Sequence, residues 1–511
     1  MKHILLPLLL GAVAASAAPL EAVRGRVQPI EPHFIGFNQN FMGQTDPWND
    51  RLIAQLKASE AATFRYPAGT VGSYWNWHTG RVDETLDPAD VMSWVQPHVR
   101  GGARAGQGRY TLENLKKAVD ATGIVPVFMI GMAVHDIDEQ IAILKDAEKS
   151  GIPIRYLELG NELIFKDAEP LLEKKFPDAQ TYGRIASDWI ARLRAAFPAA
   201  KIAACGTFVA SDSQSERRRL WNPRMMETLK GTDIITTHLY AGEIVRTEEE
   251  RAGLTEVAAQ QALTAGERAA RRRGPITAES TAATFGLVYT VWDRMLEKSL
   301  IPPGKQLWVT EWNTGGAGGG GNQWQTTLAT AALLDAFLRT NVTLTNHHTM
   351  GSAFANPGGG GGGGNAAAAP GTNPAPRPAP VNPGNSANFS TGPNATGLAL
   401  REFARITTGF TRAVELRFPD APVAKVKSGR EYPTIVGWAF GPEQGAERTA
   451  LLLNLGDTPV TVARATLPAA MKHSRQLAAA PDADPAKIQP VSGILADTLA
   501  LPPYSLTVLH E

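Results

Sequence analysis

Short apolar runs alternate with helix-patterned segments along most of this chain, and no other feature limits its fold as strongly. Eight such runs recur between residues 33 and 346, with no long antiparallel interlude. Strict alternation predicts a parallel sheet covered by helices, and eight repeats are typical of an α/β fold of the (β/α)8 TIM barrel type. The expected strands are His33–Phe37, Ala62–Tyr66, Val125–Ile130, Tyr156–Leu159, Lys201–Cys205, Ile234–His238, Gln306–Thr310 and Val342–Asn346.

A doubly wound open sheet is the alternative fold with the same alternation. Such a sheet binds dinucleotides through a glycine-rich turn after its first strand. No such turn follows His33–Phe37, where the sequence continues Asn38-Gln-Asn40. We therefore prefer the barrel, whose active site is built at the C-terminal ends of the strands.

The pattern changes near Ala413. Short strands separated by turn residues follow, which predicts a small all-β sandwich. We expect a barrel domain over residues 18–408 and a β-sandwich domain over residues 409–511, which a strand at Leu20–Val27 would join. The expected sandwich strands are Thr434–Phe440, Thr449–Asn454, Val460–Ala463 and Ser505–Leu509.

Residues 351–393 are of low complexity, with the run Gly358–Gly364 followed by alanines and alternating prolines. A segment of this composition buries too little apolar surface to order itself. We expect a disordered loop between the eighth strand and the helix Thr396–Thr408, because that helix completes the barrel. A linker between independent domains is the alternative.

The N-terminus has the pattern of an export signal. Lys2 and His3 precede an apolar run that ends at Val13, and Ala15-Ser-Ala17 provides a small-x-small cleavage pattern. The run is too short to span a bilayer. We expect residues 1–17 to be a signal peptide and the protein to be secreted or periplasmic. A buried N-terminal helix is the alternative.

Charge and cysteine content argue against several classes of partner and site. The chain has 511 residues, with 50 Lys and Arg against 49 Asp and Glu, so nothing indicates a nucleic acid or an anionic membrane as partner. Cys205 is the only cysteine, which excludes a disulfide framework and a cysteine-based metal site. His135, His347 and His348 follow no metal-binding spacing. We expect neither a metal nor a cofactor.

Two glutamates directly follow apolar strands. Gly160, Asn161 and Glu162 come after Tyr156–Leu159, and Glu311 comes after the strand that ends at Thr310. A desolvated carboxylate is costly, so two of them at buried strand ends need an explanation. In a barrel these ends converge, and two carboxylates are what hydrolysis of a glycosidic bond requires. The alternative is that each is an ordinary strand-end residue with an ionic partner.

Arg65, His238 and Tyr240 also fall at or just past predicted strand ends. A cation such as Arg65 would keep a nucleophilic carboxylate ionised, and Tyr240 could donate a hydrogen bond to it. Asn161 could hydrogen-bond a sugar hydroxyl, and Asn38, at the end of the first strand, is a further candidate for substrate binding. Each of these residues alone is more often structural.

Aromatic faces stack on the C–H faces of sugars, and several tryptophans lie on predicted loops or strand ends. We expect Trp312, beside Glu311, and Trp77 to contact substrate. The alternative for every one of them is a core position at the top of the barrel. The candidates are Trp75, Trp77, Trp94, Trp312 and Trp324.

Five short motifs together carry a family resemblance. They resemble those of the family 51 glycoside hydrolases, the α-L-arabinofuranosidases, and more broadly clan A of the retaining (β/α)8 glycosidases, with families 39 and 79 as neighbours. The resemblance runs from about Phe34 to the C-terminus, without the Gly/Pro-rich insertion. The motifs are Arg65-Tyr-Pro-Ala-Gly69, Tyr74-Trp-Asn-Trp77, Gly160-Asn-Glu162, His238-Leu-Tyr240 and Thr310-Glu-Trp-Asn313.

The resemblance implies that Glu162 is the acid/base and Glu311 the nucleophile. It implies that Asn161 contacts the sugar hydroxyl next to the anomeric carbon, with Arg65, His238 and Tyr240 in support. In the family the first strand usually ends in an acidic residue, whereas this chain has Phe37-Asn-Gln-Asn40.

The function that follows is an exported retaining exo-glycosidase that acts on fragments of polysaccharides and resembles an α-L-arabinofuranosidase. An endo-acting glycanase or a β-glycosidase of the same clan is the second hypothesis. A non-catalytic carbohydrate-binding protein is a third, although a binding module needs neither glutamate. A carbohydrate substrate is the expected partner.

Overall fold

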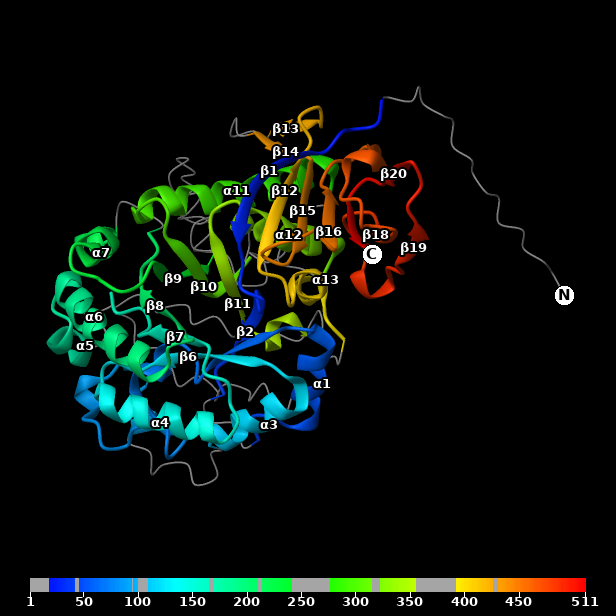
Figure 1. Cartoon of the computed structure of the whole chain (residues 1–511). Coiled ribbons are helices and arrows are strands. Elements are labelled where there is room, and N and C mark those ends of the chain that lie inside the picture. Colours follow the sequence, from blue (N-terminus) through cyan, green and yellow to red (C-terminus); the bar gives the residue numbers. More distant parts are fainter. Residues whose placement is uncertain are drawn as a thin grey trace, which may run out of the picture.

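The computed structural model describes residues 18–41, 46–93, 95–99, 109–164, 170–209, 214–240, 276–314, 322–354, 392–425 and 431–511. Within them lies a closed barrel of eight parallel strands surrounded by helices, with an antiparallel all-β region beside it (Figure 1). The predicted fold class is confirmed. The predicted signal peptide, Trp94 and most of the Gly/Pro-rich insertion lie outside the described residues.

The barrel strands follow one another around the barrel in chain order, and the last pairs with the first to close it. Three strands run two or three residues beyond their predicted ends, so that His238 and Glu311 lie within strands and are paired in register. The strands are β2 (Ile35–Asn38), β3 (Thr63–Tyr66), β6 (Val125–Ile130), β7 (Tyr156–Leu159), β8 (Lys201–Cys205), β9 (Ile234–Tyr240), β10 (Gln306–Asn313) and β11 (Val342–His348).

N-cap residues in the sequence explain where several of the helices around the barrel begin. Asn49, Thr111 and Asp136 each accept a hydrogen bond from a backbone N–H of the first turn, which is the standard N-cap interaction. The main helices are α1 (Asp50–Ser59), α3 (Leu112–Thr122), α4 (Ile137–Lys149), α6 (Ala179–Ala196), α7 (Glu216–Met226), α11 (Ala278–Ser299), α12 (Trp324–Leu338) and α13 (Ala395–Thr407).

Helix α7 begins earlier than the sequence pattern predicts. The sequence pattern predicts a short helix over Arg224–Leu229, directly after Pro223. The helix instead begins at Glu216, capped by Ser215, and contains the proline in its interior. The smaller elements on the barrel are η1 (Thr70–Tyr74), β4 (Trp75–Asn76), β5 (Arg81–Val82), η2 (Pro88–Asp90), α2 (Gln96–Val99), α5 (Pro170–Lys175) and η5 (Gly351–Ala353).

The C-terminal region is built on a seven-stranded antiparallel sheet. Its first strand in the chain, β1, comes from the N-terminal part and pairs with β12 at one edge. In spatial order the sheet contains β1 (Val23–Pro29), β12 (Arg412–Arg417), β15 (Ile435–Gly441), β16 (Thr449–Asn454), β21 (Ser505–His510), β18 (His473–Ala478) and β19 (Val491–Ile494). Smaller elements are β13 (Val423–Lys425), β14 (Glu431–Pro433), β17 (Val460–Ala463), η7 (Arg464–Thr466), η8 (Pro485–Lys487) and β20 (Thr498–Leu501).

Side chains that alternate along the central strands give this sheet two apolar faces. Trp438 and Phe440 belong to the same core as the barrel and its helices. Ile435 and Ala439 belong to a second core, which includes residues of the β17–β20 ribbon. The sheet therefore packs on the barrel helices with one face and on a smaller ribbon with the other.

Helix α12 lies at the centre of this contact, and all of its residues are buried. Its Asp335 accepts hydrogen bonds from the indole of Trp438 at 2.8 Å and from the hydroxyl of Tyr289 at 2.6 Å. Arg339 forms an ion pair with the same carboxylate. One buried side chain thus connects the sheet with two barrel helices.

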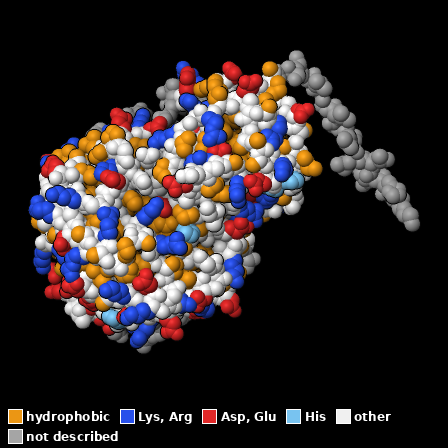
Figure 2. Space-filling view, viewed as in Figure 1, with side chains coloured by type: hydrophobic (Ala, Val, Ile, Leu, Met, Phe, Trp, Pro, Cys, Tyr) orange, Lys and Arg blue, Asp and Glu red, His pale blue; other side chains and the backbone are white. Residues whose placement is uncertain are grey.

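Acidic and basic side chains are interspersed over the face of the molecule that Figure 2 shows. Among the described residues, no helix has both the length and the apolar character needed to cross a membrane.

Candidate active site

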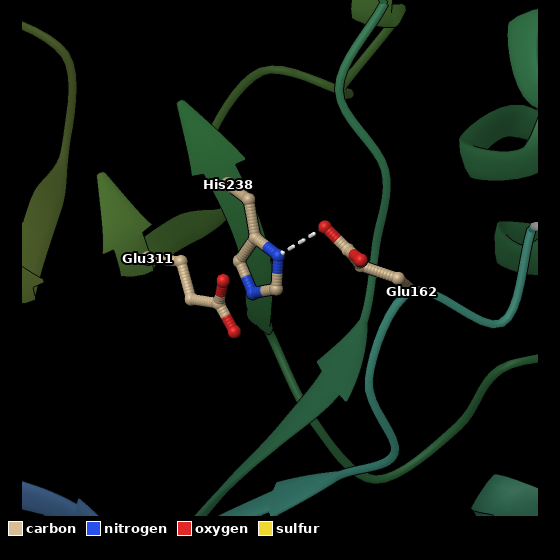
Figure 3. A group of neighbouring side chains, drawn as sticks. All are labelled: Glu162, His238 and Glu311. Carbon is tan, nitrogen blue, oxygen red and sulfur yellow. Dashed lines mark hydrogen bonds and ion pairs between the residues drawn. The ribbon is translucent and has the colours of Figure 1, made fainter. Parts of the chain in front are cut away.

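Side chains from several strands meet at the C-terminal end of the barrel. Figure 3 shows Glu311 on β10, His238 on β9 and Glu162 in the loop after β7, with the imidazole between the two carboxyl groups. One oxygen of each glutamate and one ring nitrogen of His238 lie within 4.8 Å of one another. The structure thus brings together the two predicted catalytic residues and a predicted supporting residue.

Arg65, on β3, is fully buried beneath this group. Its Nε and Nη2 donate to the two oxygens of Glu158, on β7, at 2.8 and 2.9 Å, and its Nη1 donates to Glu311. Nη2 also donates to the side-chain oxygen of Asn161 at 2.8 Å. Arg65 therefore supports Glu311 and Asn161 from within the barrel.

Glu311 is almost completely buried, and its oxygens accept hydrogen bonds from Arg65 and from the hydroxyl of Tyr240. Burial alone would raise the pKa of its carboxyl group. The positive charges of His238 and Arg65, with the Tyr240 hydrogen bond, outweigh burial and lower this pKa to about 2. Glu311 is therefore ionised at neutral pH.

The loop after β3 packs directly against Glu311. A Cβ atom added to Gly69 would lie 2.0 Å from Oε1 of Glu311, a distance that no real contact reaches. Glycine is therefore the only residue that lets the backbone pass there without displacing the carboxylate.

Glu162 is the more accessible glutamate, with its side chain 25% exposed. It follows the turn at Gly160 and has a positive φ of 47°, a conformation that costs free energy for a residue with a side chain and is found most often at functional sites. Its Oε1 lies 2.9 Å from Nδ1 of His238. The side-chain amide of the neighbouring Asn161 makes two hydrogen bonds. Its oxygen accepts from Arg65, and its nitrogen donates to the hydroxyl of Thr70.

His238 is buried and contacts Glu162 with one ring nitrogen and the hydroxyl of Thr310 with the other, at 3.2 Å. That hydroxyl donates to Glu158 at 3.0 Å. Burial lowers the pKa of His238, but the charge of Glu311 and the hydrogen bond to Glu162 outweigh it, so the pKa is raised.

Asn38, the candidate on β2, is buried and lies beside His348 of β11. Its amide nitrogen is 2.8 Å from Nδ1 of His348, and its side-chain oxygen has no partner among the described residues. Burial lowers the pKa of His348. The ring of His348 also meets that of Tyr240 edge-on. His348, which the sequence suggested only as an unconvincing metal ligand, is thus a neighbour of the site.

The four described tryptophan candidates are all buried, which favours the alternative of core positions at the top of the barrel. Trp312 faces away from Glu311 along the strand and packs edge-on against Phe337 of α12. Trp77 stacks on Phe128, and Trp324 donates its indole N–H to the backbone of Tyr504. Their apolar surface is used within the protein, and in this structure they offer no exposed face to a sugar. The fourth is Trp75.

Sequence reasoning missed Glu158 and Thr310. A glutamate in the middle of a short, otherwise apolar strand was the available signal for Glu158. Thr310 is harder to recognise, because the register of β10 against β9 shifts between Val309 and Glu311. This bulge lets Thr310 and Glu311, which are adjacent in sequence, both contact groups of the site.

Glu162, His238 and Glu311 also have the spacing of a metal-binding group. Their donor atoms are already engaged, because Arg65 and Tyr240 bind the oxygens of Glu311 and the nearest nitrogen of His238 binds Glu162. A cation beside Glu311 would also face the guanidinium of Arg65. The group therefore fits a proton-transfer site better than a metal site.

Solved structures share this architecture over almost the whole chain, at low sequence identity. A family 51 α-L-arabinofuranosidase from Bifidobacterium longum is 13% identical, with 96% of this chain and 98% of that one covered and a TM-score of 0.56. The family 51 arabinofuranosidase from Xanthomonas axonopodis pv. citri is 14% identical, with 96% and 97% covered and a TM-score of 0.55.

A 4-O-α-L-rhamnosyl-β-D-glucuronidase from Fusarium oxysporum 12S is 10% identical, with 96% and 100% covered and a TM-score of 0.51. No family model matches the sequence, and no curated protein does. The resemblance inferred from the motifs is confirmed at the level of the fold.

Proposed function

We propose that this chain is a retaining glycoside hydrolase with Glu311 as nucleophile and Glu162 as acid/base. The observation that carries the proposal is a pair of carboxyl groups with oxygens within 4.8 Å of one another but with different surroundings. Retaining glycosidases hold their carboxyl groups about 5 Å apart, and inverting enzymes about 6.5–9.5 Å apart to admit a water.

The surroundings support different roles for the two groups. Glu311 is kept ionised by Arg65, His238 and Tyr240, as a nucleophile must be. Glu162 is partly exposed and shares a hydrogen bond with an imidazole, so it can exchange a proton with a leaving group or a water.

In the first step Glu311 bonds to the anomeric carbon as the bond to the leaving oxygen breaks, and Glu162 gives that oxygen its proton. In the second step Glu162 takes a proton from water as the water attacks the anomeric carbon and releases Glu311. Buried Arg65 keeps its charge through both steps. It therefore stabilises Glu311 each time the carboxylate is regenerated.

For the substrate we propose a terminal sugar of a polysaccharide fragment, with an α-L-arabinofuranoside as first choice. The motifs and the family 51 structures with the same architecture support this choice. Asn38, in place of an acidic residue at the end of β2, makes pyranosides and uronides necessary members of any test. We also propose export from the cytoplasm, on the signal-like N-terminus, and N-terminal sequencing of the mature protein tests it.

The test of the main proposal is a panel of nitrophenyl glycosides that includes α-L-arabinofuranoside, pyranosides and a β-glucuronide, with Glu311→Ala as the blank. Proton NMR of the first turnovers on the best substrate should show a product with the anomeric configuration of the substrate. Added azide should restore part of the lost turnover of Glu311→Ala as a glycosyl azide of inverted configuration. A first product of inverted configuration would exclude the double-displacement mechanism.

A further inference from the structure

A chain of hydrogen bonds connects the interior of the barrel with the proposed acid/base. It runs from Glu158 through the hydroxyl of Thr310 to Nε2 of His238, and from Nδ1 of the same ring to Glu162. Glu158 and Thr310 are completely buried, and His238 is nearly so. Water therefore cannot replace a member of the chain without a rearrangement.

The first two contacts have a fixed direction. Arg65 donates to both oxygens of Glu158, which marks this carboxylate as an acceptor. The hydroxyl of Thr310 must then donate to Glu158, and a hydroxyl has only one proton to donate. Its oxygen can only accept from His238, so Nε2 of the ring must carry a hydrogen.

This direction determines what Nδ1 can do. A neutral imidazole carries one hydrogen, so with Nε2 protonated Nδ1 is a bare acceptor. It lies 2.9 Å from Oε1 of Glu162, and two acceptors at that distance need a proton between them. His238 and Glu162 therefore share one proton. Loss of that proton leaves the lone pair of Nδ1 facing the carboxylate of Glu162.

We propose that Thr310 and Glu158 are positioning residues that fix the Nε2–H tautomer of His238 and thereby retain the proton of the acid/base Glu162 up to higher pH. This inference rests on the proposed role of Glu162. If Thr310 could not accept from Nε2, the neutral ring would turn to its Nδ1–H tautomer and donate to ionised Glu162. The deprotonated pair would then be stabilised, and the pKa of the shared proton would fall.

The other charged groups around His238 act on this proton without depending on Thr310. The raised pKa of His238 agrees with a proton that is held tightly at the pair. A Thr310→Val substitution changes none of these charges and keeps the shape of the side chain. The titratable and charged groups that face His238 are Arg65 of β3, Glu158 of β7, Glu162 after β7, Glu311 of β10 and His348 of β11.

The first experiment observes the tautomer directly and needs no substrate. Two-bond ¹H–¹⁵N spectra distinguish Nε2–H from Nδ1–H imidazoles, and His238→Gln identifies the signals of His238. At a pH above the titration of the pair, the full-length protein should show Nε2–H. Thr310→Val should show Nδ1–H, and Thr310→Ser should restore Nε2–H.

The second experiment measures the pH profile of kcat/KM on a glycoside with a poor leaving group. In Thr310→Val the basic limb should move down by about one pH unit, a tenfold change in acid dissociation. Thr310→Ser should return it to its original place. Thr345→Val is the matched control, because Thr345 is an equally buried barrel threonine whose hydroxyl has no partner among the described residues.

An Nδ1–H tautomer in the unmodified protein would overturn the inference, whether or not Thr310→Val folds. An unmoved basic limb in a folded Thr310→Val protein would overturn it equally. The failure of the unmodified protein to cleave any glycoside would instead count against the proposed function. The spectra would still show whether Thr310 fixes the ring.

Discussion

Glu162, in the loop after β7, and Glu311, within β10, lie at the same end of the barrel, yet their surroundings favour different chemistry. Glu162→Ala removes the proposed proton donor and leaves the proposed nucleophile, Glu311, in place. We expect cleavage to slow by about a hundredfold or more on substrates with poor leaving groups, and far less on activated phenols that leave without a proton. Steady-state rates on the two classes of glycoside measure this. Equal losses on both would remove Glu162 from the acid role.

Tyr240 acts on the other carboxyl group. It donates to the ionised form of Glu311, so its hydrogen bond helps to lower the pKa of that carboxyl. Tyr240→Phe should therefore raise this pKa, and the acidic limb of the kcat/KM profile should move up by about one pH unit. Turnover should fall less than in Glu311→Ala, because the proposed nucleophile remains. An acidic limb that stays in place would mean that this hydrogen bond does not stabilise the charge.

A substitution at Gly69 tests how closely the loop after β3 packs on Glu311, the proposed nucleophile. A methyl group there would lie where Oε1 of Glu311 now lies. We expect Gly69→Ala to fold, because the change affects a loop, and to lose most of its turnover because the carboxylate must move. Circular dichroism and kcat together measure the two effects. Nearly full activity would show that the carboxylate can move without loss.

The sequence predicted the strands of the barrel well because each is a short run in which most residues are apolar, aromatic or β-branched. Two of the strands that were missed, β18 and β19, have side chains that are mostly exposed or half-buried, so little apolar pattern marks them. The position of Trp312 could have been anticipated, because side chains alternate along a strand and Glu311 faces the site. The position of Thr310 could not, because a bulge is a property of the paired strands.

The polar residues of the barrel strands also differ in how well the sequence predicts their roles. Arg65, His238 and Tyr240 were recognisable because they end strands whose tips converge. Glu158 lies within β7, deeper in the barrel. In the sequence it is only an isolated glutamate in a short apolar run. The role of Glu158 depends on its contact with Arg65, which is distant in the chain but adjacent in the barrel. Such a pairing follows from the topology.

Helix α12 joins the barrel to the C-terminal sheet through Asp335. Asp335→Ala would leave the indole of Trp438 and the hydroxyl of Tyr289 without their acceptor and Arg339 without its counter-ion. We expect a loss of about 3 kcal/mol in the free energy of unfolding, measured by denaturant titration. Asp233→Ala is the control, since its ion pair with Lys305 is exposed and should matter little. Similar losses of unfolding free energy in both variants would mean that the contacts of Asp335 stabilise the protein no more than an exposed ion pair does.

At the scale of the whole molecule, the barrel and the sheet share one apolar core. Removal of everything after Thr408 would uncover the surfaces of α11, α12 and α13 that now pack against Trp438 and its neighbours. We expect the shortened protein to aggregate, which size-exclusion chromatography of the expressed protein would show. A folded, active monomer would mean that the barrel is stable alone.

The pairing of β1 with β12 also has a consequence for the order of events as the chain is made. Val23 lies opposite Arg417, so β1 has no partner in this sheet until the chain has been made as far as β12. Until β12 has been made, the edge of β1 is unpaired, and unpaired strand edges promote aggregation. β1 is short and carries arginines at two of its seven positions, which makes premature association less favourable. This sheet can therefore form completely only after β12 has been made, when two segments far apart in the sequence meet as neighbouring strands.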